Sequence, residues 1–185
     1  MTKHMPSNAT LQVALTSWRS AAQDRGVPDE AAFHAANAGN RATIMNDAFT
    51  LDVGPGGDFV FRDVGATLAR YIELDDPGRR PPFGPAGTVS DLIHRTIIQV
   101  VALRSPHFAL GRTHDDDDAF EAICLPLITA SGATAVFGAL ARLGHAALPL
   151  PAAAPKVEIE AIIDLAAFQS EVEKTNAAKP KPGGE

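Results

Sequence analysis

Apolar and polar residues alternate in the middle of the chain, and this alternation predicts a β-hairpin that leads into a helix. In residues 49–53, three apolar side chains are separated by single polar ones, which is the period of a strand with one solvated face. The glycine- and proline-rich stretch 54–58 predicts a turn, and an aromatic, β-branched run follows at 59–61. Residues 66–72 are typical of a short helix. The centre of the chain therefore predicts a small α+β fold.

Residues 8–25 carry an apolar stripe at helical spacing, formed by Leu11, Leu15, Trp18 and Ala22. Gly26 is expected to end this helix, because glycine readily adopts the left-handed conformation that follows a helix C-terminus. Trp18 is predicted to anchor the helix on the body of the domain, and a dimer contact is the alternative.

The strongest helical pattern begins at Thr88. Thr88 and Asp91 resemble a capping box in which aspartate replaces the usual glutamate. An apolar face then continues for three turns, and Ser105-Pro106 ends it, since proline disfavours helical geometry in the residue before it. This face consists of Val89, Leu92, Ile93, Thr96, Ile97, Val100 and Val101, while His94, Arg95 and Gln99 lie off it.

Three short runs with turn signals between them, at 107–114, 120–130 and 134–143, predict an antiparallel meander. Pro126 falls inside the second run, which indicates an edge strand or a bulge there. Five residues that recur at strand or helix spacing are expected to be largely buried: Phe59, Phe61, Leu92, Ile97 and Leu125.

Composition changes along the chain predict its organisation. Proline and alanine dominate 146–155, which favours an extended linker. Residues 157–174 alternate like a strand at first, yet Ile159, Ile162, Ile163 and Ala166 fit a helix better, and a helix is favoured. The expected divisions are a flexible N-terminus at 1–10, a domain at 11–145, the linker at 146–155, a helical arm at 156–176 and a disordered tail at 177–185.

The 185-residue chain has 45% hydrophobic residues and a formal net charge of −6, typical of one soluble domain with flanking arms. The acidic balance argues against nonspecific nucleic-acid binding. Met1 to Thr10 lack an apolar signal region, and no run approaches the roughly 18 apolar residues of a membrane span. A cytoplasmic location is therefore expected. The single cysteine, Cys124, has no partner within the chain for a disulfide.

The chain carries few signals of chemistry. Asp115–Asp118 lack the glycine and the later glutamate of a calcium loop, so a solvated turn is predicted. The six histidines form no HxxxH or HExxH pair, and no phosphate-binding glycine motif is present. Cys124 has no nearby cation and is interpreted as a buried structural thiol. We expect no catalytic residue, no metal site and no enzymatic activity.

The sequence leaves the roles of three other residues open. Asp63 and Glu121 lie in strand runs, where they could face outward or pair with Arg62 and Arg142 across the sheet. A buried catalytic acid is the minority interpretation of these two. His94 is the natural axial candidate for haem, but its place off the apolar face of the helix argues against it.

Several motifs together resemble a family of alphaproteobacterial PAS-domain proteins in which one PAS domain makes up most of the chain. The resemblance covers roughly residues 11–143. It rests on Trp18-Arg19, FTLDV at 49–53, FVFR at 59–62 followed by Val64-Gly65 and Thr67-Leu68, EAICLPL at 121–127, and VFGAL at 136–140. The reactive-cysteine context of the flavin-binding subgroup is absent, which argues against flavin chemistry.

The resemblance implies a sensory or regulatory module in bacterial signal transduction, acting through a partner protein or a homodimer. The implied fold is α+β: a PAS-like antiparallel five-stranded sheet with helices covering one face, plus an N-terminal helix and a C-terminal helical arm. A PAS-type ligand cavity would be lined by Phe59, Phe61, Leu68, Tyr71, Leu92, Thr96 and Cys124. The dimer or partner candidates are Leu11, Leu15, Trp18, Ile162 and Phe168. The alternatives are a small α+β enzyme with a buried carboxylate base and a haem-binding or small-molecule sensor.

Overall fold

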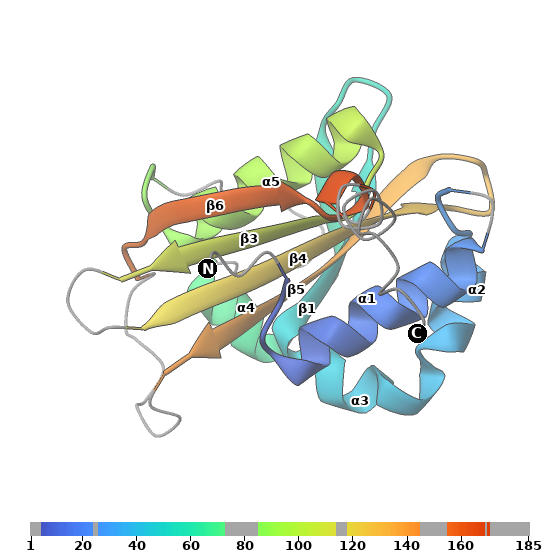
Figure 1. The fold of residues 1–185 in the computed structure, drawn as a ribbon. Coiled ribbons are helices and arrows are strands. Elements are labelled where there is room, and N and C mark those ends of the chain that lie inside the picture. Colours follow the sequence, from blue (N-terminus) through green and yellow to red (C-terminus); the bar gives the residue numbers. More distant parts are fainter. Residues whose placement is uncertain are drawn as a thin grey trace, which may run out of the picture.

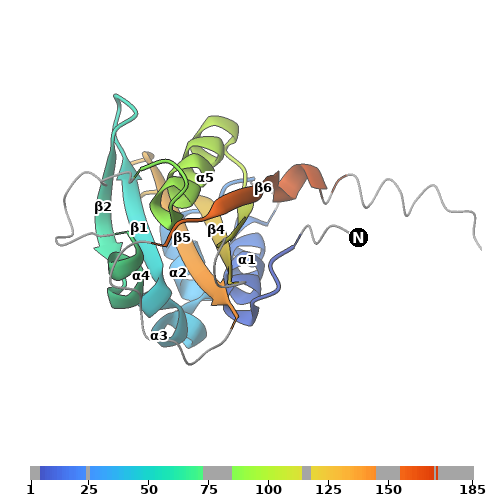
Figure 2. The ribbon, with the colours of Figure 1, turned by 90° about the vertical axis from the view of Figure 1, so that its left-hand side faces the viewer.

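A six-stranded antiparallel sheet lies between two layers of helices (Figures 1 and 2). The computed structural model describes residues 5–23, 26–72, 85–113, 118–144, 155–168 and 170. The strands are β1 (Ala48–Val53), β2 (Phe59–Val64), β3 (His107–Arg112), β4 (Ala119–Ile128), β5 (Thr134–Leu143) and β6 (Glu158–Asp164). The helices are α1 (Ala9–Ala22), α2 (Glu30–Ala36), α3 (Arg41–Ile44), α4 (Ala66–Tyr71) and α5 (Val89–Leu103), with 3-10 turns η1 (Ala38–Asn40) and η2 (Met45–Asp47).

The strand order is β2-β1-β5-β4-β3-β6, so the two longest strands, β4 and β5, lie at the centre. They pair along all ten residues of each, from Ala119↔Leu143 to Ile128↔Thr134. The two outermost pairings are irregular: β1–β2 shifts register between Thr50 and Leu51, and β3–β6 shifts between Leu110 and Gly111. The predicted meander of three strands and the central hairpin are confirmed.

Helix α5 covers one face of the sheet, and Thr88 caps it as predicted, although Asp91 bonds the amide of Gly87 and not that of Thr88 itself. Thr88 Oγ1 accepts from the Asp91 amide at 3.3 Å, and Asp91 Oδ2 accepts from the Gly87 amide at 3.0 Å. Burial alone would raise the pKa of Asp91, but the hydrogen bonds from Arg95 and Gly87 outweigh it and lower that pKa. The apolar stripe of α5 packs with Leu51, Phe61 and the inward side chains of β4 and β5 into one core.

Helices α1, α2 and α3 cover the other face and enclose a second core. Trp18 anchors α1 on the sheet, because its ring is buried and its indole N–H donates to the Pro126 carbonyl at 2.7 Å. Phe33 of α2 packs on Phe137 of β5 with ring centroids 4.9 Å apart. The prediction that Trp18 is a core anchor is therefore confirmed.

Two features of the predicted fold are wrong. The helices cover both faces of the sheet, and the sheet has six strands, because the segment expected to be a helical arm forms β6 instead. Ile159 and Ile162 pack toward α5, whereas Ile163 packs toward α1. The register shift in the β3–β6 pair brings an extra residue into β6, and this bulge produces an apolar spacing that resembles a helical stripe.

Three smaller predictions also need correction. Residues 5–10 are not a flexible end, since Asn8 caps α1 through hydrogen bonds from the Thr10 and Leu11 amides. Helix α1 ends at Ala22, before the expected Gly26. Pro126 lies in a central strand, but β3 begins opposite Cys124, so no strand pairs with β4 on that side at Pro126. The expected linker at 146–155, apart from Pro155, and the tail at 177–185 lie outside the described residues.

Candidate functional site

The structure brings the seven cavity candidates together on the α5 side of the sheet. Phe61, Leu68, Tyr71, Leu92 and Cys124 belong to one core cluster, and the half-buried Phe59 packs against it. Thr96 is fully buried on the same helix as Leu92. Strands, the short helix α4 and α5 thus contribute side chains to one interior, as the resemblance implies. Of the five residues expected to be largely buried, Phe59 alone is only half-buried.

Aromatic rings occupy this interior. The Phe49 ring lies over Gly138 on the neighbouring strand, and a Cβ added at Gly138 would collide with it. Phe49 meets Phe61 edge-to-face with ring centroids 5.4 Å apart, and Tyr71 meets Phe120 in the same way at 5.5 Å. Gly138 therefore provides space that a side chain of the protein fills.

Two polar groups of this interior, the hydroxyls of Thr96 and Tyr71, already have partners within the protein. Thr96 Oγ1 donates to the Leu92 carbonyl at 2.7 Å. The Tyr71 hydroxyl is hydrogen-bonded to Arg142. Complete burial raises the pKa of Cys124, so the thiol stays neutral and unreactive. A small-molecule site usually presents a few convergent polar groups that are free to orient a ligand, whereas the Thr96 and Tyr71 hydroxyls are already bonded within the protein.

The prediction of a solvated acidic turn at Asp115–Asp118 is wrong for Asp118. Its carboxylate is buried and accepts from Arg142 Nε at 2.8 Å and also from Arg142 Nη2. This bond holds the pKa of Arg142 above its ordinary value. Asp115, Asp116 and Asp117 lie outside the described residues.

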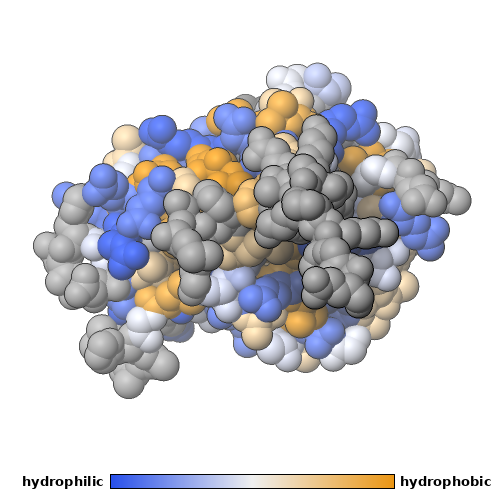
Figure 3. Space-filling model, in the orientation of Figure 1, coloured by the Kyte–Doolittle hydropathy of each residue, from blue (hydrophilic) through white to orange (hydrophobic). Residues whose placement is uncertain are grey.

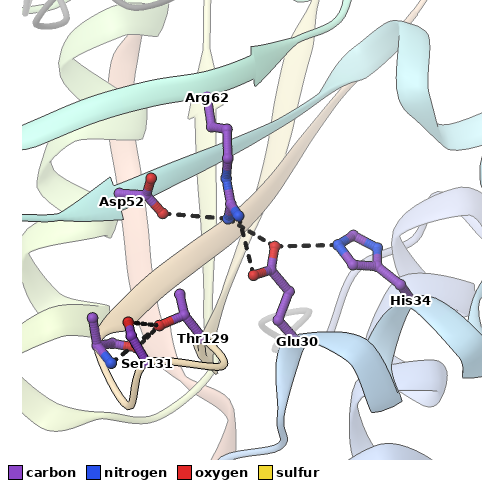
Figure 4. Close-up of polar contacts among 7 residues, drawn as sticks. Glu30, His34, Asp52, Arg62, Thr129 and Ser131 are labelled. Atoms are coloured by element: carbon purple, nitrogen blue, oxygen red, sulfur yellow. Dashed lines mark hydrogen bonds and ion pairs between the residues drawn. The ribbon is translucent and has the colours of Figure 1, made fainter.

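Neither of the two strand acids pairs with the arginine considered for it. Asp63 is exposed, whereas Glu121 is buried and accepts hydrogen bonds from Ser7 and Asn8. Arg62 instead makes a two-pronged contact with Glu30, at 2.7 and 3.2 Å, and lies 3.3 Å from Asp52 (Figure 4).

The Arg62 contacts tie α2 to the β1–β2 hairpin at the protein surface. Glu30 also lies 3.4 Å from His34 one helical turn along, so the guanidinium and the imidazole share one carboxylate (Figure 4). Ion pairs with this exposure contribute little to stability, about 0–1 kcal/mol each. The cluster thus joins α2 to the hairpin by surface contacts.

Asp47 is the described carboxyl whose environment comes nearest to that of a catalytic base. Burial raises its pKa, and a hydrogen bond with Thr67 partly offsets this. However, Asp47 is only half-buried, at the end of the η2 turn beside the start of α4. It therefore does not provide the carboxylate in a hydrophobic pocket that the enzyme alternative requires.

The N-terminal dimer candidates are not available at the surface. Leu11, Leu15 and Trp18 are buried against the protein's own sheet. Ile162 packs against the α5-side core, and Phe168 is half-buried. The apolar stripe of α1 thus covers the protein's own sheet.

The structure instead exposes two large apolar residues of α5, Ile98 at 43% and, in the last turn, Leu103 at 55%. The sequence did not single them out. Ile98 directly follows the fully buried Ile97 and lies off the apolar face that the helical spacing predicted.

An open pocket of about 200 Å³ lies between the start of α1 and the η1–α3 segment. It is lined by Ala9, Thr10, Val13, Asn40, Thr43 and Ile44, none of which titrates. In the part of the chain that the structure describes, no group of three or more His, Cys, Asp or Glu side chains could hold a metal ion. Within the same ranges, no helix combines the length and the apolar character that crossing a bilayer requires.

No family model, curated protein or solved structure matches this chain at a significant level.

Proposed function

We propose that this protein is a PAS-like regulatory module that acts by binding another protein chain through the exposed part of α5 around Ile98 and Leu103. Five strands in the order β2-β1-β5-β4-β3, with α4 and α5 inserted between β2 and β3, are compatible with the fold that the sequence resemblance implies. The proposal concerns the mode of action, which is contact between proteins.

One observation carries the proposal: the interior is filled, while apolar residues are left outside. Phe49 occupies the space over Gly138, and the polar groups beneath α5 are bonded within the protein. Ile98 and Leu103 are in contrast exposed on a helix whose inner face is bound to the sheet along its length. Large apolar side chains held on a rigid surface are typical of protein interaction sites.

A second copy of the chain is the proposed occupant of this face. Ile98 and Leu103 lie about 140° apart around α5, so the proposed twofold contact is centred on Ile98 of each copy, with Leu103 at its margin and the core unchanged. Arg95 and Arg104 flank the apolar positions, and Asp91 already pairs with Arg95, which lowers the repulsion between like charges across such an axis.

Sedimentation velocity across a range of micromolar concentrations tests the proposal. The parent chain is expected to form a dimer, and a double variant with Ile98→Asp and Leu103→Asp is expected to remain monomeric and folded. A double variant with Thr16→Asp and Ser20→Asp is the matched control, since it adds the same two charges at exposed positions of α1, on the other face of the sheet, and should leave the dimer intact.

A parent chain that stays monomeric would contradict self-association and leave a heterologous partner as the account of the exposed face. An absorbance spectrum and mass spectrometry of freshly purified protein address the sensor alternative. A bound haem or organic ligand would contradict the interpretation that the core is filled.

A further inference from the structure

The open pocket of about 200 Å³ lies on the α1 side of the sheet, away from the filled core beneath α5. One of its walls is the first part of α1, and the other is the η1–α3 segment. Three residues of each wall line it: Ala9, Thr10, Val13, Asn40, Thr43 and Ile44.

Contacts outside the pocket hold its two walls in place. Ser17 of α1 is buried, and its hydroxyl donates to the side-chain oxygen of Asn37, at the end of α2, at 3.3 Å. The Asn40 amide donates to the Asn37 carbonyl at 3.0 Å, which ties η1 to the same residue. Trp18 fixes α1 on the sheet. None of these bonds uses a side chain that lines the pocket, so the space is formed without a ligand, as is usual for small-molecule sites.

The floor of the pocket is apolar and continuous with the α1-side core. Ile44 is only 1% exposed and belongs to that core, and the half-buried Val13 packs against it. Ala9 has no side-chain atom beyond Cβ, so it leaves the space open. An apolar group that enters the pocket would displace water from this floor, which is favourable.

Polar side chains surround the apolar floor. Thr10 and Thr43 each carry a hydroxyl and Asn40 carries a carboxamide, so the pocket offers both donors and acceptors. Among the residues that the structure describes, none of these three side chains has a hydrogen-bond partner. On the surface around α1 and α3, hydrophilic and apolar residues lie side by side (Figure 3). The three polar groups are therefore available to orient a ligand over the floor.

The charge and the size of the pocket restrict what it can bind. None of the six lining residues carries a charge at neutral pH. An ion would lose part of its hydration here without an opposite charge in return, so an uncharged molecule is favoured. An apolar cavity of about 150 Å³ holds benzene. The present volume of about 200 Å³ suits a molecule of roughly six to ten non-hydrogen atoms.

We propose that this pocket binds a small uncharged amphiphile, that is, a ring or short chain of carbon atoms with one hydroxyl or carbonyl group. The carbon atoms would lie on Ile44 and Val13, and the polar group would bond with the side chains around them. The pocket and α5 lie on opposite faces of the sheet, so the inference does not depend on the proposed dimer.

Cyclohexanol is a probe of this size and polarity. Titrated into the ¹⁵N-labelled full-length chain, it should shift the backbone amide signals of residues 9–13 and 40–44 until they saturate. The dissociation constant should be in the millimolar range, because so small a ligand has few atoms that contribute to affinity. Cyclohexylammonium and cyclohexanecarboxylate are charged molecules of similar shape, and they should bind at least about tenfold more weakly.

Two substitutions on α3 test whether the probe occupies the pocket. Thr43→Phe should abolish the shifts, because the larger side chain fills the space. Ala42→Phe is the matched control, since Ala42 is exposed on the same helix but does not line the pocket, and it should leave the affinity unchanged.

A triple variant tests the polar groups. Thr10→Val, Asn40→Leu and Thr43→Val together keep the size of the side chains and remove every polar group of the lining. This variant should bind cyclohexanol about fivefold more weakly or worse, the loss expected for one neutral hydrogen bond.

Shifts that do not saturate, or that persist in Thr43→Phe, would overturn the inference. Equal affinity for cyclohexanol and its charged counterparts would also overturn it, and that comparison uses the parent chain alone, so it does not depend on the folding of any variant. The double variant of Ile98 and Leu103 should bind cyclohexanol like its parent, which separates this outcome from that of the dimer test.

Discussion

Asp118 and Arg142 form a largely buried ion pair, and this pair gives the first prediction. Asp118→Ser should lower the free energy of unfolding by about 1.5–3 kcal/mol, since a hydrogen bond to a charged group is lost and Arg142 is left without its acceptor. Urea denaturation measures this. Asp63→Ser, at an exposed position of β2, is the control and should change the free energy by less than about 0.5 kcal/mol. Equal effects of the two substitutions would show that the buried pair adds nothing.

The adjacent residues Ile97 and Ile98 form a natural matched pair for the second prediction. Ile97 is fully buried, so Ile97→Ala should lower the free energy of unfolding by ~2–5 kcal/mol through lost burial and a residual cavity. Ile98 is exposed, and Ile98→Ala should change it by less than about 0.5 kcal/mol. Chemical denaturation of both variants tests the register of α5. Similar losses for the two would mean that the helix is rotated from the position described.

At the residue scale, the sequence predicted burial well wherever a residue belongs to a regular pattern. Phe61, Leu92, Ile97 and Leu125 are buried as expected. It could not predict that the Phe49 ring covers Gly138, or that Glu121 meets Ser7, because these contacts join residues that are far apart in the chain. Neither periodicity nor composition carries information on such pairs.

Among the elements, β6 provides the third prediction. A chain that ends at residue 148 lacks β6, so it exposes the edge of β3 together with the core positions that Val157, Ile159 and Ile162 cover. Such a chain should be much less stable than the parent and should bind a hydrophobic dye, by urea denaturation and dye fluorescence. A chain that ends at residue 170 keeps β6 and should match the parent. Equal stability of the two shortened chains would contradict the role of β6 in the sheet.

The strands with regular alternation and the capped helix α5 were predicted close to their observed bounds. Residues 134–143 form β5 as expected, and Thr88 caps α5 as expected. β6 was misinterpreted because a strand that is partly covered on both faces and contains a bulge loses its period of two. The element that the sequence described worst is thus the one whose pairing is least regular.

For the molecule as a whole, the fourth prediction concerns pH. Burial lowers the pKa of His94 below its ordinary value of 6.5, with a further lowering from Arg95 and an opposing effect from Asp91. Below about pH 6.5 the unfolded chain therefore takes up a proton at His94 before the folded chain does, and the free energy of unfolding falls as the pH falls.

Urea denaturation at several pH values between 7.5 and 5.5 tests this, with His94→Gln as the comparison. The variant cannot gain a charge at this position, so its free energy of unfolding should fall less across the same interval. An identical pH dependence in the parent and in His94→Gln would contradict the assignment.

The arrangement of two helical layers could not be predicted from single elements. The stripe on α1 is equally suited to covering a sheet or to pairing with another copy, and the choice depends on the free face that β4 and β5 present. Only in the assembled sheet is it clear that α1 covers this face. The large apolar residues that stay exposed then belong to α5.

The register shifts next to β2 and β6 bear on how this protein behaves in crowded solution. A sheet whose two edge strands are open can in principle pair with strands of further copies at either edge, and repeated pairing of this kind leads to fibres. Here the three inner strand pairs keep one register along their length, whereas the pairs formed by the edge strands, β1–β2 and β3–β6, each contain a register shift. A strand from another copy would meet a bent edge strand at either edge of the sheet. This bend disfavours the addition of strands. We expect copies to meet through side chains on a helix and to stop at two, so that concentrated protein remains dispersed instead of polymerising.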